Sequence, residues 1–220
     1  MDPEYPQLAE PGTSRHVRLT CMKDDTHKLA LHTCCAPCLI EPLRLLSVEF
    51  SDLIAVYYNP NITPEEEYRR RRDTFVSYAQ LTYTPYGELD YDAQRWQEAM
   101  GTHLAVLDES GHDTAPESPA RCRRCYELRF EPVIAWAAEH GSTHFATTLT
   151  VSPFQQRDVI DEAARRLCDE AGLTYAGRDF SAHYPDALRV ARELGLYRQN
   201  YCGCTLRPSV ESNTTTECKG

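Results

Sequence analysis

The sequence predicts an α/β fold in which one parallel sheet carries helices on both faces. Short runs of β-branched and aromatic residues alternate along the chain with longer segments that place apolar residues at helical spacing. Strands that alternate with helices in this way favour a parallel sheet, because parallel strands need long crossover connections. The chain has 220 residues, of which 41% are hydrophobic, and this is enough for one domain with a full core.

Each element has its own signal in the sequence. The first strand is expected at Leu29–Thr33, an apolar run that ends in polar residues, and the second at 52–58 (DLIAVYY). Between them, a helix over 37–50 has Leu39, Leu43 and Leu46 at helical spacing. Further short strands are expected at 82–86, 143–147 and 174–176.

Hydroxyl-proline pairs mark the expected starts of three more helices. A serine or threonine at the N-cap followed by proline at the first helical position is a typical start signal. Thr63-Pro64 is predicted to begin a helix that reaches about Gln80, with a capping-box glutamate at Glu66. Ser118-Pro119 and Ser152-Pro153 predict the other two starts, the first helix reaching about His140.

Composition limits the classes of protein. Residues 1–28 begin with acidic residues and prolines and lack the basic start and apolar stretch of a secretory signal, so we expect a flexible leader and a cytoplasmic protein. No apolar run approaches the length that crosses a bilayer, and no membrane partner is expected. A polar loop is expected at 108–120 and a flexible tail at 205–220. The net charge of −10 argues against a general electrostatic grip on nucleic acid.

Seven of the ten cysteines fall into three clusters that lie far apart in sequence. They are Cys34, Cys35 and Cys38 in HTCCAPC, Cys122 and Cys125 in RCRRCY, and Cys202 and Cys204 in YCGC. The first cluster directly follows the first predicted strand, and ligands in parallel sheets collect at the carboxyl ends of strands. Grouped thiolates in a reducing compartment suit a soft metal or an electron-transfer centre, so a redox metalloprotein is predicted.

The residues alone leave the chemistry of these clusters open. Cys122 and Cys125 share one face near the start of a helix, a pattern that fits zinc, an iron-sulfur cluster or a dithiol pair. Cys202 and Cys204 would form a strained, easily reduced disulfide, or would chelate a second metal with Cys38 as a third ligand. A structural zinc site needs only four ligands and leaves three clustered thiols unexplained. Cys21, Cys168 and Cys218 are expected to take no part.

Five segments in this order resemble the QueH family of epoxyqueuosine reductases. They are LHTCCAPC, YYNPNITPEEEYRRR, RCRRCYELR, FATTLTVSPFQ and YRQNYCGC, and together they span about residues 29–204. The resemblance implies a Rossmann-like fold of the HUP type for this catalytic domain. It also implies that the protein reduces the epoxide of epoxyqueuosine, carried at the wobble position of tRNA, to give queuosine.

The resemblance also implies roles for individual residues. Cys34, Cys35, Cys122 and Cys125 would hold a 4Fe-4S cluster, and Cys38 is a candidate ligand of one additional iron. Cys202 and Cys204 would be the catalytic redox-active pair or ligands of that iron. The electrons would come from an unidentified low-potential donor. The alternative function is a zinc-stabilised module that binds a nucleotide or RNA without catalysis.

Two further sets of side chains are candidates for this chemistry. His32, Tyr201 and Asp179 are candidate proton donors. Arginines next to the motifs are expected to form a local surface for a splayed anticodon loop. They are Arg69, Arg70, Arg71, Arg72, Arg121, Arg123 and Arg124. Taken by itself, however, the run at 69–72 fits an exposed helix face paired with Glu65–Glu67 better than a phosphate-binding patch. Glu67 and Arg71 could alternatively bind a polar ligand.

Overall fold

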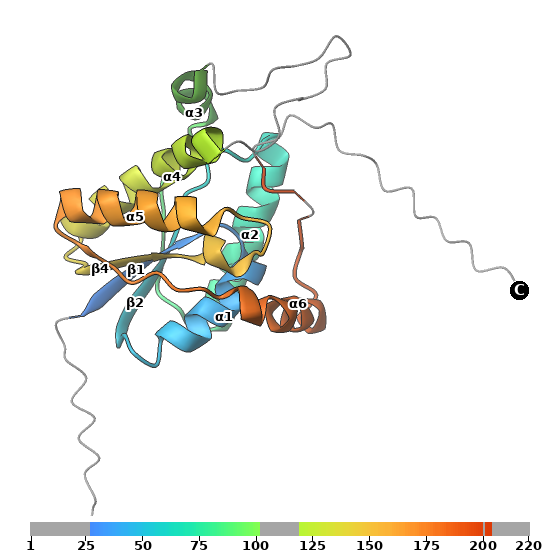
Figure 1. The fold of residues 1–220 in the computed structure, drawn as a ribbon. Helices are drawn as coiled ribbons and strands as arrows, with labels where there is room; N and C mark the ends of the chain where they lie inside the picture. The colour runs from blue at the N-terminus through green and yellow to red at the C-terminus, as the bar shows by residue number, and fades with distance from the viewer. Residues whose placement is uncertain (1–26, 102–118, 200, 204–220) are drawn as a thin grey trace, which may run out of the picture.

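The computed structural model describes residues 27–101, 119–199 and 201–203, and its strands all belong to one sheet (Figure 1). The strands and helices alternate along most of the chain. The strands are β1 (Lys28–Thr33), β2 (Asp52–Tyr57), β3 (Tyr86–Glu88), β4 (His144–Thr147) and β5 (Thr174–Tyr175). The α-helices are α1 (Ala36–Leu46), α2 (Glu65–Leu81), α3 (Ala93–Met100), α4 (Pro119–Glu139), α5 (Arg157–Ala171) and α6 (Tyr184–Glu193). Two short 3-10 helices follow β4 and precede α6, η2 (Thr148–Val151) and η3 (Ser181–His183).

The five strands run parallel in the order β3-β2-β1-β4-β5, with β1 at the centre. This is the order of the first five strands of a doubly wound Rossmann sheet, in which the direction of winding reverses beside the first strand. The register pairs His32 of β1 with Val56 of β2 and with Thr147 of β4. The carboxyl ends of these three strands therefore lie level with one another. The predicted fold class is confirmed.

Helices cover both faces of the sheet, and each face has its own core. Alternate residues of β1 point to opposite sides, so that Leu29 and Leu31 pack in one cluster and Ala30 in the other. The first cluster contains residues of α1, α2 and α6, and the second contains Phe130 of α4 and Ile160 of α5. Figure 1 shows α4 with α5 on one side of the sheet and α1 with α6 on the other.

The third strand begins four residues later than expected. Residues 82–84 instead terminate α2, where the Thr84 amide donates to the Ala79 carbonyl and the Thr82 hydroxyl donates to the Tyr78 carbonyl. Tyr83 has a φ of 52°, a left-handed conformation that a strand does not use. The expected strand at 82–86 is therefore wrong except at its last residue.

Two of the hydroxyl-proline pairs do not cap a helix. The helix α2 begins at Glu65 with Pro64 at its N-cap and has no side-chain cap, so the capping box with Glu66 is not formed. Ser152-Pro153 lies in a turn in which the Ser152 carbonyl accepts from the Gln155 amide, and α5 begins only at Arg157. The helices α3 and α6 were not expected from the sequence.

The leader, most of the 108–120 loop and the tail lie outside the described residues, except that Lys28 is already part of β1. Among the described helices, none combines the length and the apolar character that a membrane crossing requires.

Candidate metal and redox site

Three segments far apart in sequence meet at the carboxyl edge of the sheet. The Asn59 side chain, after β2, donates from Nδ2 to the Thr33 carbonyl at the end of β1, at 2.9 Å. The Cys34 amide donates to the hydroxyl of Thr148, which follows β4, at 3.1 Å. These bonds replace the sheet pairing where the strands diverge and hold the three ends together. The sequence prediction that these segments converge is confirmed.

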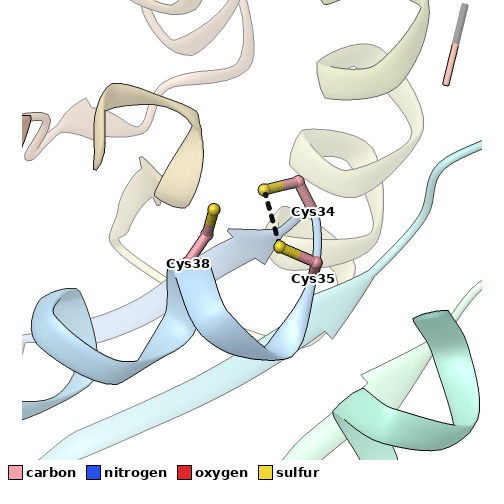
Figure 2. A group of neighbouring side chains, drawn as sticks. All are labelled: Cys34, Cys35 and Cys38. Atoms are coloured by element: carbon pink, nitrogen blue, oxygen red, sulfur yellow. Dashed lines mark hydrogen bonds between the residues drawn. The ribbon is translucent and has the colours of Figure 1, made fainter. Parts of the chain in front are cut away.

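Cys34, Cys35 and Cys38 form a compact group of thiols. Cys34 follows β1 directly, Cys35 is the N-cap of α1 in an extended conformation, and Cys38 lies in the first helical turn. Their sulfur atoms all lie within 4.8 Å of one another, and Cys35 and Cys38 are buried. Figure 2 shows the three side chains pointing toward one another. The Cys34 and Cys35 sulfurs are 3.9 Å apart. The change from strand to helix thus aims adjacent sulfurs at one centre.

The three thiols share one favoured negative charge. Hydrogen bonds from Cys35 and Cys38 lower the pKa of Cys34 well below its usual range, and the positive charge of Arg129 lowers it further. Burial, together with the Cys34 thiolate, raises the pKa of Cys35 to about 12. Hydrogen bonds with Cys34 and Cys35, together with burial, raise the pKa of Cys38. Loss of a proton is therefore favoured at Cys34 over Cys35 and Cys38.

Side chains from other segments donate to these sulfurs. The Thr148 hydroxyl lies 3.4 Å from the Cys34 sulfur and donates to it. The Gln199 amide nitrogen donates to the Cys35 sulfur at 2.8 Å, over a separation of 164 residues. The carboxyl-terminal segment that carries YCGC therefore reaches the first cysteine cluster.

The other described cysteines of the clusters line one pocket beside the first helical turns of α4. Cys122 and Cys125 are 9% and 5% exposed, one turn apart on α4, and Cys202 joins them in the lining. The lining of the pocket consists of Asn61, Arg121, Cys122, Cys125, Tyr126, Arg129, Gln155 and Cys202. Thiols from two distant motifs thus face the same space.

A buried arginine connects the two groups of thiols. Arg129 is only 3% exposed, lines the pocket and lowers the pKa of Cys34 through its charge. Its Nη2 donates to the Asn59 side-chain oxygen at 2.6 Å, which fixes the guanidinium beneath the sheet edge. A buried cation here favours the anionic form of nearby sulfur.

The candidate proton donors occupy different environments. His32 is fully buried, and burial lowers its pKa to about 3 with a smaller contribution from Arg129. Because a carbonyl can only accept, Nε2 of His32 donates to Tyr58, and Nδ1 accepts from the Thr147 hydroxyl at 2.8 Å. Both ring nitrogens are therefore committed, as in a satisfied core histidine.

Tyr201 and Asp179 are also engaged. The Tyr201 hydroxyl donates to the Thr63 carbonyl at 2.8 Å, and burial raises its pKa. Asp179 is half exposed, accepts from the Ser181 amide and pairs with Arg157 at 2.5 Å. Hydrogen bonds to Ser181 lower the pKa of Asp179 and keep it charged.

The structure places the predicted site residues in two groups. Within the described residues, the group with all sulfurs inside 4.8 Å holds Cys34, Cys35 and Cys38, and it does not include Cys122 or Cys125. Cys204 lies outside the described residues, as do Cys21 and Cys218. Cys168 packs among apolar side chains of α4 and α5, as expected of a bystander.

No role for Arg129 or Gln199 was predicted from the sequence, and Arg71 was expected on an exposed face or at a polar ligand. Arg71 is 2% exposed and donates to Glu67 at 2.6 Å. The Glu67 to Arg71 spacing predicts this ion pair, but no sequence signal shows that the pair is buried. Arg129 follows Cys125 by one helical turn, which places both residues on one face of α4. This spacing is a sequence signal from which a role for Arg129 near the cysteines could have been predicted.

The donor set fits an iron-sulfur centre. The group within 4.8 Å consists only of thiols, and the neighbouring His32 has no nitrogen lone pair available for a metal. Soft, buried sulfur ligands select iron-sulfur clusters, zinc or copper(I) over hard cations.

The fold and these thiols define a class of protein, namely a Rossmann-like α/β protein with a buried, cysteine-only site at the carboxyl edge of its sheet. The family model "Epoxyqueuosine reductase QueH" matches residues 29–208. The chain belongs to this family, and the protein is an oxidoreductase of the epoxyqueuosine reductase type. This membership favours an enzyme over the alternative of a zinc-stabilised module without catalysis.

Curated relatives are similar over most of their length. An epoxyqueuosine reductase QueH from Thermotoga maritima is 32% identical over 181 residues, which cover 79% of this chain and 86% of the relative. One from Acinetobacter baylyi is 29% identical over 199 residues, covering 83% of this chain and 81% of the relative.

A solved structure was also matched. It is the U34-tRNA thiolase NcsA from Methanococcus maripaludis with its [4Fe-4S] cluster, at 14% identity and a TM-score of 0.46. The match covers 80% of this chain and 60% of that structure, so the chain spans less than two thirds of it.

Proposed function

We propose that this protein removes the epoxide oxygen of epoxyqueuosine in tRNA and gives queuosine. Both C–O bonds of the epoxide break, the carbons form an alkene, and the oxygen leaves as water. The reaction consumes two electrons and two protons. The electrons come from a low-potential donor protein or reductant, and the substrate and the reducing environment place the reaction in the cytoplasm.

The observation that carries this proposal is the placement of thiols from the three cysteine motifs in two groups, one directly after β1 and one at the pocket beside α4. Cys34 and Cys35 follow β1, Cys122 and Cys125 lie at the start of α4, and Cys202 lines the pocket of the α4 pair. Arg129 lowers the pKa of Cys34 through its charge and also lines the pocket of the α4 pair. Buried thiols beside a fixed cation suit a site that must hold sulfur in its anionic form.

We propose that Cys34, Cys35, Cys122 and Cys125 hold a 4Fe-4S cluster. Such a cluster, when bound, supplies electrons one at a time. Hydrogen bonds from Cys35 and Cys38, together with the charge of Arg129, lower the pKa of Cys34, and a metal ligand binds as the thiolate. The Thr148 and Gln199 hydrogen bonds orient the Cys34 and Cys35 sulfurs from outside the ligand set.

Cys202 and Cys204 are proposed as the redox-active pair or as ligands of an additional iron, with Cys38 as a further ligand. Support comes from the position of Cys202 in the same pocket as Cys122 and Cys125. Support for Cys38 comes from its sulfur, which lies within 4.8 Å of those of Cys34 and Cys35. The buried Cys38 thiol keeps its proton more firmly than Cys34 does, because its neighbour already carries the charge.

For tRNA, we propose a small contact surface at the mouth of the pocket. Several of the arginines expected to contact RNA already pair with acids: Arg69 with Glu65, Arg72 with Glu88 and Arg123 with Glu162. Inside the pocket, Asn61 and Arg129 keep buried polar atoms without a hydrogen-bond partner among the described residues. A polar ligand such as the diol of the substrate would satisfy them.

The test is a single-turnover assay on epoxyqueuosine-containing tRNA. Protein reconstituted with iron and sulfide under anaerobic conditions is mixed with this tRNA and dithionite, and nucleosides are analysed by mass spectrometry. We expect loss of one oxygen atom per modified nucleoside. Unchanged epoxyqueuosine with a fully loaded protein would reject the proposed function. Broad visible absorption that bleaches with dithionite separates an iron-sulfur protein from a zinc protein, which is colourless.

A further inference from the structure

The segment that carries Cys202 is held against the start of α2 by a dense set of contacts. Two hydrogen bonds join the segment to the loop before α2: the Thr63 amide donates to the Gly203 carbonyl at 3.3 Å, and the Tyr201 hydroxyl donates to the Thr63 carbonyl at 2.8 Å. The Tyr197 hydroxyl donates to the Glu67 carboxylate at 2.8 Å. The motifs NPNITPEEEYRRR and YRQNYCGC thus pack against each other and are joined by hydrogen bonds.

Arg71 is the centre of this contact. Its Nη1 donates to the Cys202 carbonyl at 3.3 Å and its Nη2 to the Tyr201 carbonyl at 3.2 Å. Its Nε donates to Glu67 at 2.6 Å, and its guanidinium lies 4.8 Å from the centre of the Tyr201 ring. The whole side chain is 2% exposed. The Cys202 carbonyl accepts from both Asn61 and Arg71, and Cys202 also lines the pocket beside α4.

Gly203 fits the same contact from the other side. It has a φ of 107°, which side-chain-bearing residues rarely adopt. A Cβ at this position would lie 2.8 Å from Cγ1 of Ile62 and 3.2 Å from Nδ2 of Asn61. The latter nitrogen donates to the Cys202 carbonyl at 3.3 Å. Glycine therefore allows the segment to approach the loop closely enough for two hydrogen bonds to form, from the Thr63 amide to the Gly203 carbonyl and from Asn61 to the Cys202 carbonyl.

We propose that Arg71 is a positioning residue that grips the backbone of Tyr201 and Cys202 and so directs the Cys202 sulfur into the pocket. This inference rests on the proposed function, in which Cys202 takes part in the reduction. With this role, Arg71 is no longer among the arginines expected to contact tRNA. Lysine cannot replace arginine here, because an ammonium group lacks the planar fork that reaches two carbonyls and a carboxylate together.

The test compares three variants of the full chain. Arg71→Lys keeps the charge and loses the fork, and Gly203→Ala disturbs the same contact without touching the helix. Arg69→Lys is the matched control, since Arg69 is exposed on the same helix and pairs only with Glu65 among the described ion pairs. Hydrogen exchange of the peptide over residues 197–203 measures whether the segment opens. Exchange of the β1 peptide verifies that the sheet stays folded.

We expect about tenfold faster exchange of the 197–203 peptide in both Arg71→Lys and Gly203→Ala, because each loses bonds that oppose local opening. Arg69→Lys should match the unchanged protein. In the epoxide assay, kcat should fall about 10- to 100-fold in the first two variants, with KM within about twofold.

The outcomes are decisive in each case. Unchanged exchange in both variants would overturn the proposal, as would a raised KM with an intact kcat, which would assign Arg71 to tRNA binding. Faster exchange with an intact kcat would also overturn it. If the unchanged protein itself removes no oxygen, the proposed function fails, and the exchange measurement alone decides whether Arg71 docks the segment.

Discussion

Individual cysteines in this chain differ in what surrounds their sulfur atoms. Cys34 receives a hydroxyl hydrogen bond and Cys35 an amide hydrogen bond, each from a distant segment. Cys168 packs among apolar side chains, and burial raises its pKa to about 12. Burial raises the pKa of Cys35 to about 12 as well, so a raised pKa does not distinguish Cys35 from Cys168. Burial alone therefore does not separate ligands from bystanders, whereas polar partners at the sulfur do.

This difference predicts the effect of single alanine substitutions on iron content. Cys35→Ala and Cys125→Ala should each lose most of the bound iron and lower kcat by about 100-fold or more. Cys168→Ala is the matched control and should keep the iron while costing only about 1 kcal/mol of unfolding free energy. Iron and sulfide per chain are measured after anaerobic reconstitution. Equal iron in all three variants would contradict the proposed ligand set.

Two neighbouring threonines predict a second contrast. The Thr148 hydroxyl accepts from the Cys34 amide at 3.1 Å and donates to the Cys34 sulfur, whereas the Thr150 hydroxyl only donates to the Thr147 carbonyl, at 3.4 Å. Thr148→Val strands a donor, so we expect it to lower the free energy of unfolding by about 1–3 kcal/mol. Thr150→Val, equally buried, should cost less than about 1 kcal/mol. Equal losses in urea denaturation would refute this account.

At the scale of elements, the central strands were predictable and the outer parts of the fold were less so. Strands β1, β2 and β4 are buried, and their apolar runs show this directly. The three-residue β3 is shorter than its sequence window, because the end of α2 uses the threonines that a strand would need. The helix starts predicted at 63–64 and 152–153 were wrong, because proline occurs in turns as well as in the first turn of a helix.

The site shows the same division. Grouping of Cys34 with Cys35 and Cys38 follows from their spacing at a strand end. The shared pocket of Cys122 and Cys202 depends on tertiary packing between α4 and a segment 80 residues away, which no local pattern encodes. The buried state of Arg71 was missed for the same reason, since its neighbours Arg69 and Arg72 are exposed.

The end of α5 predicts a test of element stability. Gly172 closes this helix with a φ of 71°, the left-handed conformation that side chains other than asparagine rarely adopt. Gly172→Ala should therefore lower the free energy of unfolding by about 1 kcal/mol, and Gly172→Asn should lower it by less. Thermal or urea denaturation measures both. An alanine variant as stable as the asparagine variant would contradict the argument.

At the scale of the whole molecule, charge constrains how tRNA is held. The chain carries a net charge of −10, and several exposed arginines near the motifs are paired with carboxylates. These pairings reduce the positive charge that the three arginines offer to phosphates. Recognition must then depend on the splayed base and its modification more than on the tRNA backbone.

This balance predicts a weak salt dependence of tRNA affinity. For a protein that neutralises few phosphates, the slope of log K against log salt should be no steeper than about −3. Binding of epoxyqueuosine-containing tRNA is measured between low and moderate salt by fluorescence anisotropy. A slope near about −6 would show an extensive phosphate interface and would contradict the expected mode of recognition.

The shortness of the outer strands has a consequence for how the protein behaves at high concentration. The two flanking strands, β3 and β5, contain three and two residues. Each border of the sheet therefore offers few unpaired backbone amides and carbonyls to a passing chain. Long, flat borders are the templates on which sheets of separate molecules join and precipitate. The shortness of both edge strands therefore disfavours association of separate molecules through backbone pairing between their sheets.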